Sequence, residues 1–333
     1  MYSYEEFKEL VTERLKELVK KDYPDIAVHQ STIPMDNQLM DVLVFTKAYE
    51  EMGVAPSLYL HKLYGDYVRQ GDFEYIMQQC SLQLRDNLKL TADVIETLKD
   101  QSSLANRITF ELIHTEQNKE FLKQAPHREF LDLSVVYNCY FKSEKIEGHA
   151  RVTDTLAELL GVTEEELYVL AYENTKRVHK PIVKPLGDVV LYMMAKDHEG
   201  IDLEEIPEWN QTSKFNIYML TNRERERGAA SLLYPEELVK LAEKLDSDLY
   251  IVPASVDEVL VVETGGYNPE ELAQTVYEMN KLIREVEDRL SNQVYFYNRQ
   301  TQEISLATDT EHTMLTEDHE AELDENIGMG MGG

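Results

Sequence analysis

The segment from Asn222 to Gly228 alternates arginine with glutamate and holds the densest group of basic side chains in an acidic sequence. It lies between a predicted strand and the start of a predicted helix. At such a junction, free backbone N–H groups and arginine guanidinium groups can hold an anion. The candidate binding residues are Asn222, Arg223, Arg225 and Arg227. Two interleaved glutamates nearly cancel the positive charge, however, so a solvated loop is the favoured interpretation.

Two histidines, His114 and His127, lie near the acids Glu116 and Asp132, and imidazole and carboxylate groups are ligands for divalent metals. The spacing of these four residues matches no known ligand pattern. A cluster of hydrogen-bonded loop residues is therefore favoured, in which Pro126 and His127 fix a turn before the next strand. We retain His127 and Asp132 as candidate binding residues and predict no metal site.

The sequence contains none of the common motifs for nucleophilic catalysis, zinc-dependent hydrolysis, nucleotide binding or calcium binding. Its two cysteines, Cys80 and Cys139, form no C-x-x-C pair and have no histidine at motif spacing, which favours ordinary reduced thiols. We predict no catalytic residue and no cofactor, and we expect that the protein is not an enzyme.

The charge of the chain restricts its partners. The sequence has 63 Asp and Glu against 33 Lys and Arg, a formal net charge of −30. Nucleic acids and anionic membranes would repel such a surface, so we expect neither as a direct partner and instead expect another protein with basic regions. The acidic N-terminus and the short apolar runs predict no signal peptide and no membrane span, which favours the cytoplasm.

Local capping patterns mark the helix starts. The predicted starts are Ser3 with Glu6, Thr163 with Glu166, Pro235, and Asn268 with Pro269. The last of these helices is predicted to run to Leu290, with a heptad-like apolar seam that includes Met279 and Ile283. We interpret this seam as core and not as a dimer interface, so a monomer is favoured.

A first group of short strands is predicted over residues 25–32, 40–45 and 56–60, around a turn-rich segment at 34–37. Further strands are predicted over 131–141, 215–221, 248–253, 258–263, 293–297 and 303–306. Residues 150–200 are predicted to be mostly helical. Helices and strands mix without strict alternation, which predicts an α+β fold with short, largely antiparallel sheets. We expect an N-terminal α+β domain over 1–150, a helical segment followed by a C-terminal α+β domain over 151–308, and a disordered acidic tail ending in Gly and Met over 309–333.

Several segments resemble one protein family. They are Leu220-Thr221-Asn222, Gly228 to Leu233, Leu249 to Leu260, Pro126 to Leu133 and Thr163 to Leu167. Together they resemble an uncharacterised family of Firmicutes proteins, frequent in gut Clostridia, that is defined only as a domain of unknown function. The similarity covers about residues 1–306 and is most specific over 216–306. It implies a cytosolic bacterial protein and no mechanism.

We therefore expect a non-enzymatic interaction module that works by binding another protein. Two alternatives stay open. An acidic protein can mimic nucleic acid in the cleft of a DNA-binding protein, which would require a continuous acidic ridge. An enzyme of unrecognised class would require a deep pocket that holds His127, Asp132 or Asn222.

Overall fold

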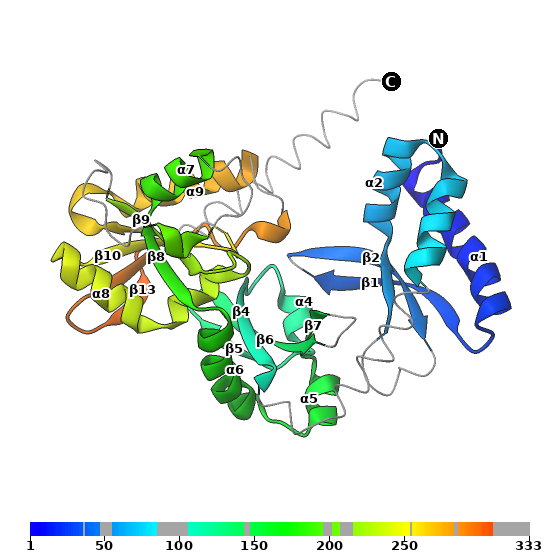
Figure 1. The fold of residues 1–333 in the computed structure, drawn as a ribbon, viewed down its shortest axis with the longest axis horizontal. Helices are drawn as coiled ribbons and strands as arrows, with labels where there is room; N and C mark the ends of the chain where they lie inside the picture. The colour runs from blue at the N-terminus through cyan, green and yellow to red at the C-terminus, as the bar shows by residue number, and fades with distance from the viewer. Residues whose placement is uncertain are drawn as a thin grey trace, which may run out of the picture. The chain divides into compact units, whose positions relative to one another are not determined.

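The computed structural model describes residues 1–35, 37–46, 55–84, 106–142, 147–195, 202–206, 216–253, 255–282 and 286–308. The chain divides into two compact units that interleave in sequence. The first comprises Met1–Phe110, Thr115–Arg128 and Val136–Asn174, and the second comprises Glu111–His114, Glu129–Val135 and the described part of Thr175–Gly333. Figure 1 shows their helices and strands.

The N-terminal part of the first unit is a helix-covered antiparallel sheet. Helix α1 (Tyr4–Asp22) begins with the predicted capping box, in which Ser3 and Glu6 bond each other's backbone N–H groups. The sheet has the order β1 (Ala27–Met35), β2 (Gln38–Thr46), β3 (Ser57–Tyr59), and α2 (Leu60–Gln70) follows it. Helix α1 buries Phe7, Val11, Leu15 and Val19 in a core shared with strand and α2 residues. Residues 73–84 are also helical.

In the predicted turn-rich segment 34–37, Pro34 and Met35 belong to β1 and Asn37 lies in the hairpin turn. Pro34 pairs with Leu39 and Met35 with Gln38, so the ladder of β1 and β2 continues to the hairpin end. Asn37 turns the chain with φ of 66°, a left-handed conformation that Asn tolerates better than most residues. The prediction was too broad here because proline at an edge strand donates no ladder bond and can still be part of a strand.

A second sheet contains β4 (Ile108–His114), β5 (His127–Phe130), β6 (Leu133–Lys142) and β7 (Glu147–Arg151). Its order is β4-β6-β5, with β7 also paired to β6. The accompanying helices are α4 (Lys119–Leu122), α5 (Asp154–Leu160) and α6 (Glu164–Val178). Thr163 caps α6 through the predicted box with Glu166. Every residue of β4 is buried.

The second unit is built on a six-stranded sheet of order β13-β12-β10-β11-β9-β8. The strands are β8 (Pro181–Pro185), β9 (Ile217–Asn222), β10 (Leu249–Val252), β11 (Val259–Glu263), β12 (Tyr295–Asn298) and β13 (Glu303–Leu306), and the strand pairs are antiparallel. Helices α7 (Leu186–Ala195) and α9 (Pro269–Leu282) cover one face, and α8 (Pro235–Leu245) covers the other (Figure 1). The connections contain the short 3-10 helices η3 (Leu203–Glu205), η4 (Gly228–Leu233), η5 (Thr264–Gly266) and η6 (Val286–Asp288).

The side chains under α7 and those under α9 form two neighbouring apolar clusters. Val189 of α7 packs with Met219 of β9, and Val276 of α9 packs with Val252 of β10. Leu260 of β11 touches both clusters, because β11 lies between β9 and β10 in the sheet. The two helices therefore lie side by side on one face of the sheet.

The predicted α+β class with antiparallel sheets is confirmed. The described part of residues 150–200 is mostly helical, as predicted, although it also contains β8, an edge strand with a proline at each end. One helix boundary was predicted wrongly. The helix that starts after Asn268 is shorter than predicted, because α9 ends at Leu282 and η6 follows. The seam residue Ile283 and the predicted tail lie outside the described residues.

Candidate functional site

A cavity of about 270 Å³ lies in the second unit between α7 and α9, over the strands β9, β10 and β11. Its wall is mainly apolar and includes three methionine side chains besides leucine and valine. Three polar residues, Arg225, Glu258 and Asn280, complete the lining. A concave apolar site with a few convergent polar groups is the usual form of a ligand site in proteins.

Asn222 builds the loop that brings Arg225 to this cavity. Asn222 is buried at the end of β9, where its Nδ2 donates to the carbonyl of Glu226 at 2.7 Å and its Oδ1 accepts from the N–H of Glu226 at 3.3 Å. The N–H of Arg225 donates to the carbonyl of Asn222. These hydrogen bonds hold the backbone of Arg225 at φ of 57°, a left-handed conformation that costs a non-glycine residue about 1–2 kcal/mol. Strain retained in a loop that aims one side chain is a known property of functional sites.

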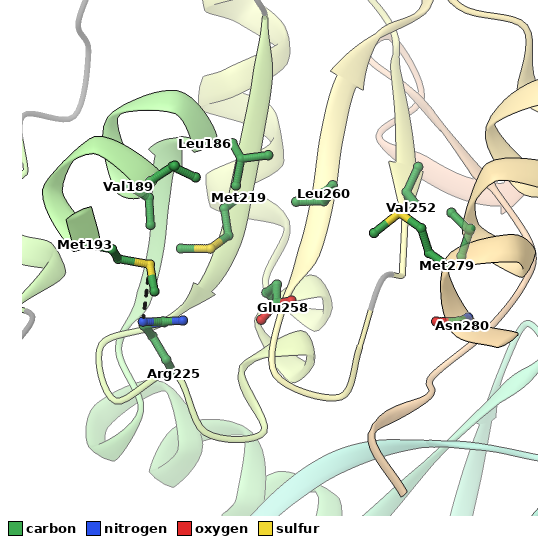
Figure 2. Close-up of a pocket in the computed structure, with 12 residues that line it drawn as sticks. Leu186, Val189, Met193, Met219, Arg225, Val252, Glu258, Leu260, Met279 and Asn280 are labelled. Atoms are coloured by element: carbon green, nitrogen blue, oxygen red, sulfur yellow. Dashed lines mark hydrogen bonds between the residues drawn. The ribbon is translucent and has the colours of Figure 1, made fainter. Parts of the chain in front are cut away.

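The guanidinium group of Arg225 has few polar partners in the cavity. Its Nη1 donates a weak hydrogen bond to Sδ of Met193 at 3.8 Å (Figure 2). Its Nε is buried and has no hydrogen-bond partner in the part of the chain that the structure describes. A buried donor without a partner costs about 1–3 kcal/mol, so an acceptor placed here would be bound favourably.

Asn280 supplies the opposite kind of polar atom. Asn280 is only 4% exposed and lies on α9, where its Nδ2 donates to the carbonyl of Ser291 and to Oδ1 of Asn292. Its Oδ1 is buried without a hydrogen-bond partner among the described residues. The cavity thus has an unused donor on Arg225 and an unused acceptor on Asn280, with the carboxylate of Glu258 between them in Figure 2.

Gly228 and Asp257 make close backbone contacts and hydrogen bonds that fix the same loop. A Cβ atom at Gly228 would lie 2.4 Å from the carbonyl oxygen of Asp257 and 2.8 Å from the backbone nitrogen of Asn222. The N–H of Arg227 donates to Oδ1 of Asp257 at 2.9 Å, and the hydroxyl of Thr221 donates to the carbonyl of Asp257 at 2.6 Å. Only glycine fits this close approach of two backbone segments.

The other two arginines of the loop do not line the cavity. Arg223 is exposed and pairs with Asp202 and Glu204 at 3.1 and 3.4 Å. Arg227 pairs through Nε with Glu111 at 3.3 Å, and Glu111 is a 2% exposed residue of β4. Of the four loop candidates, the structure therefore places Arg225 at the cavity, with Asn222 positioning it, whereas Arg223 and Arg227 have structural ion pairs.

Asp132 and His127 are not among the residues that line the cavity. Asp132 lies in the turn between β5 and β6, where it accepts hydrogen bonds from the hydroxyl groups of Tyr295 and Ser291. His127 belongs to the first unit, and its Nδ1 lies 2.8 Å from the carbonyl of Ala125. Asp132 is thus a hydrogen-bonded loop residue, whereas His127 is the first residue of strand β5 and does not lie in the predicted turn.

Arg128, the neighbour of His127, belongs to a charged network in the first unit. It donates to both carboxylate oxygens of Glu164, at 3.2 and 2.9 Å, and the buried Tyr137 donates to the same carboxylate. Burial alone would raise the pKa of Glu164, but the hydrogen bonds from Arg128 and Tyr137 hold it below its usual value. The charges of this network are satisfied internally, which is typical of a structural role.

The described residues provide no other chemically active cluster. No group of three His, Cys, Asp or Glu side chains in them is arranged to hold a metal ion. Burial raises the pKa of the Cys80 thiol to about 12 and that of Cys139 to about 11, so neither is a thiolate near neutral pH. No helix of the described part has the length and apolar composition of a membrane span.

Next to the cavity, α7 presents three exposed apolar side chains, which we call the α7 face: Val190, Leu191 and Met194. Leu191 is 66% exposed and Met194 is 71% exposed. Val190 lines the cavity as well, and Met279 of α9, on the opposite wall, is also exposed. Glu205 of η3 accepts a hydrogen bond from Tyr192 and places an exposed acidic group beside this face.

Sequence reasoning identified Arg225 and Asn222 but not Glu258, Asn280 or the α7 face. The latter residues come from α7, from α9 and from the position just before β11, and only the sheet order brings these together. One signal was present in the sequence, because residues 189–195 form its longest apolar run. A helix that buries only one face needs apolar residues only on that face, so an unbroken apolar run also places apolar side chains on the exposed face.

The fold and the cavity thus define an antiparallel α+β protein with a small mixed-polarity site. The chain belongs to a family of unknown function, DUF5688, whose family model matches residues 4–299. The family resemblance seen in the sequence is thereby confirmed. No curated protein and no solved structure matches the chain.

Proposed function

We propose that this protein is a monomeric, non-enzymatic interaction module of the cytoplasm that binds a basic amphipathic segment of another protein on the α7 face. The observation that carries the proposal is the exposure of Leu191 and Met194 on one short helix. Exposed apolar side chains that cluster, unlike scattered ones, are typical of protein-binding surfaces. Methionine contributes an adaptable contact surface of the kind found at such sites.

Charge supports the choice of a basic segment. The chain carries a formal charge of −30, and Glu205 is exposed next to α7. A segment with apolar residues on one side and Lys or Arg on the other would place leucine-like side chains on Leu191 and cations near Glu205. Electrostatic attraction raises the association rate and disfavours acidic competitors.

A synthetic peptide tests this surface directly. We expect a labelled amphipathic helix of Leu and Lys to bind in fluorescence anisotropy, and a peptide with Glu in every Lys position to bind far more weakly. Leu191→Asp should weaken the Leu/Lys complex about tenfold, because burying a large apolar side chain contributes about 1.5–3 kcal/mol. The complex should also weaken as salt increases.

Val169→Asp is the matched control, since Val169 is a 61% exposed apolar residue on α6. Both substitutions add a negative charge, so purely electrostatic attraction would weaken in neither variant. The proposal requires that only Leu191→Asp weakens binding. Equal affinities of both variants for the Leu/Lys peptide would contradict it.

A further inference from the structure

Strand β1 forms an open edge of the sheet in the N-terminal part of the first unit. The order β1-β2-β3 leaves β1 paired on one side only among the described strands. Residues 29–32 of this strand are exposed. Its register with β2 is continuous from Ala27 to Met35, so no bulge turns the edge away from a partner. Unpaired backbone N–H and C=O groups at such an edge are a template for another strand.

The ladder shows which backbone groups face this open edge. The N–H of Phe45 in β2 donates to the carbonyl of Pro56, on the side of β3. Phe45 is opposite Val28, and hydrogen-bonded and non-hydrogen-bonded pairs alternate along an antiparallel ladder. The N–H and C=O groups of Val28, Gln30 and Thr32 therefore face away from β2. In the part of the chain that the structure describes, these groups have no hydrogen-bond partner.

This edge lacks the usual protection against pairing, which consists of charged side chains, prolines or bulges. The nine residues of β1 include no Asp, Glu, Lys or Arg, although the whole chain is 29% charged. Pro34 has the next outward position, but it lies near the hairpin end. By contrast, the edge strand β8 has a proline at each end and contains Lys184, and the edge strand β13 begins with Glu303. Strand β1 is therefore suited to accept a further strand.

Helix α1 borders the open edge and supplies its charge. A groove of about 500 Å³ lies between α1 and the first half of β1, with Glu9, Glu13 and Lys16 on the helix side. Lys16 pairs with Glu13 at 3.1 Å, whereas Glu9 has no ion pair among the described residues. The side chain of Gln30 points to the same side, since its Nε2 donates to Oγ1 of Thr12 at 2.7 Å. A side chain that enters this groove therefore meets a net negative charge.

We propose that β1 binds an extended segment of another protein as an added antiparallel strand, with Lys or Arg at the alternate positions that face α1. The backbone of the segment would pair with the outward groups of Val28, Gln30 and Thr32. Because directly paired residues have their side chains on the same face, the residue opposite Gln30 would lie on the side of α1 and Glu9. Main-chain hydrogen bonds would provide the affinity, and the alternate side chains would provide the specificity.

Charge selects this occupant over a second copy of the chain. Two β1 strands paired with each other would place both α1 helices on one face of a joint sheet, with Glu9 and Glu13 of each copy at the shared edge. Each copy also carries a formal charge of −30, and like charges disfavour association. A basic segment would instead pair with Glu9. The inference is independent of the proposed α7 surface, because β1 belongs to the first unit and α7 to the second.

A pair of isomeric peptides tests the strand pairing. The probe is a labelled Lys-Val-Lys-Val-Lys-Val-Lys peptide, and its binding to the full chain is measured by fluorescence anisotropy. One isomer has N-methyl groups on the first three Lys residues, and the other has them on the three Val residues. In the proposed complex the N–H groups of the Lys residues face β1, and those of the Val residues face away from it. We expect the Lys-methylated isomer to bind about tenfold or more weakly than the Val-methylated isomer.

Substitutions in the chain test the same edge. Thr32→Pro removes an outward N–H and leaves the ladder with β2 intact, so it should weaken peptide binding about tenfold. Thr32→Val is the matched control, because it loses the same hydroxyl group and keeps the N–H. Glu9→Lys should also weaken binding, and more than Glu17→Lys, which makes the same charge change on α1 outside the groove lining. Melting curves identify a variant that fails to fold, and the peptide isomers and Glu9→Lys then decide.

The inference would be overturned by equal binding of the two N-methylated isomers, by unchanged affinity in folded Thr32→Pro, or by no binding of the unmodified peptide at about 1 mM. A dimer of the parent chain in sedimentation that Thr32→Pro dissociates would assign β1 to a second copy and would also overturn it. Leu191→Asp should keep full affinity for the Val/Lys peptide, so a failure of the α7 face would leave this result intact.

Discussion

Gly228→Ala should lower the free energy of unfolding by about 3 kcal/mol or more, at the upper end of the range for overpacked sites. The new Cβ would lie 2.4 Å from the carbonyl oxygen of Asp257 and 2.8 Å from the backbone nitrogen of Asn222. It would also lie 2.2 Å from the hydroxyl oxygen of Thr221. Because two of these three atoms are backbone, no side-chain rotation relieves the contact. Urea unfolding followed by circular dichroism measures the loss.

Gly265→Ala is the control for this prediction. Gly265 is exposed, has no heavy atom within 4 Å of a built Cβ and lies in η5 of the same unit. Its substitution should change the free energy of unfolding by less than about 1 kcal/mol, through the unfolded chain alone. Equal free energies of unfolding for the two variants would contradict the prediction, because the backbone around Gly228 would then move to accommodate a Cβ atom at little cost.

Arg227→Met should cost about 3 kcal/mol of unfolding free energy, because it removes the cation that pairs with Glu111 at 3.3 Å. Glu111 is 2% exposed within the fully buried strand β4, and removing one partner of a buried ion pair costs about 3–5 kcal/mol. We expect a value at the lower end of this range, because the side chain of Arg227 is 30% exposed and water weakens its attraction to Glu111. Urea unfolding is again the measurement.

Two further variants separate this effect from lost packing. Arg223→Met removes an exposed ion pair with Asp202 and should cost less than about 1 kcal/mol. Adding Glu111→Gln to Arg227→Met should recover part of the loss, since the carboxylate charge is then gone. A double variant that is as unstable as Arg227→Met would mean that the charge of Glu111 is not the cause.

Helix starts were predictable because their signals are local. The boxes at Ser3 and Thr163 and the cap at Asn268 form with residues three positions away, and each is present. The hairpin of β10 and β11 was likewise predictable from two apolar runs joined by a short connection. In such cases neighbours in sequence supply all the partners that the element needs.

Strands whose stability depends on distant partners were missed. Strand β4 is fully buried but contains Glu111, so its sequence does not show the apolar pattern of a buried strand. The ion pair with Arg227, which is far away in sequence, explains this carboxylate. Strand β8 is flanked by two prolines, and its place at the sheet edge is a property of the whole sheet. The end of α9 was also misjudged, because the seam towards Leu290 continues after the helix ends at Leu282.

In the candidate site, too, the residues with local partners were predictable and those with distant partners were not. Arg225 and Asn222 were identifiable from the unusual Arg–Glu alternation after a strand, and their mutual contacts are local. Glu258 and Asn280 carry no sequence signal, since isolated polar residues at strand and helix positions are common. Their role in the cavity arises only from the order of β9, β11 and β10 beneath α7 and α9.

Photo-crosslinking in the native host tests the proposed interaction surface most directly. A photoreactive amino acid replaces Leu191 on the α7 face or, as a control, the equally exposed Val169 on α6. We expect position 191 to yield one dominant protein adduct, whose cross-linked peptide has apolar residues on one side and Lys or Arg on the other, and position 169 to yield none. The same adduct from both positions, or a cross-linked peptide without basic residues, would contradict the account.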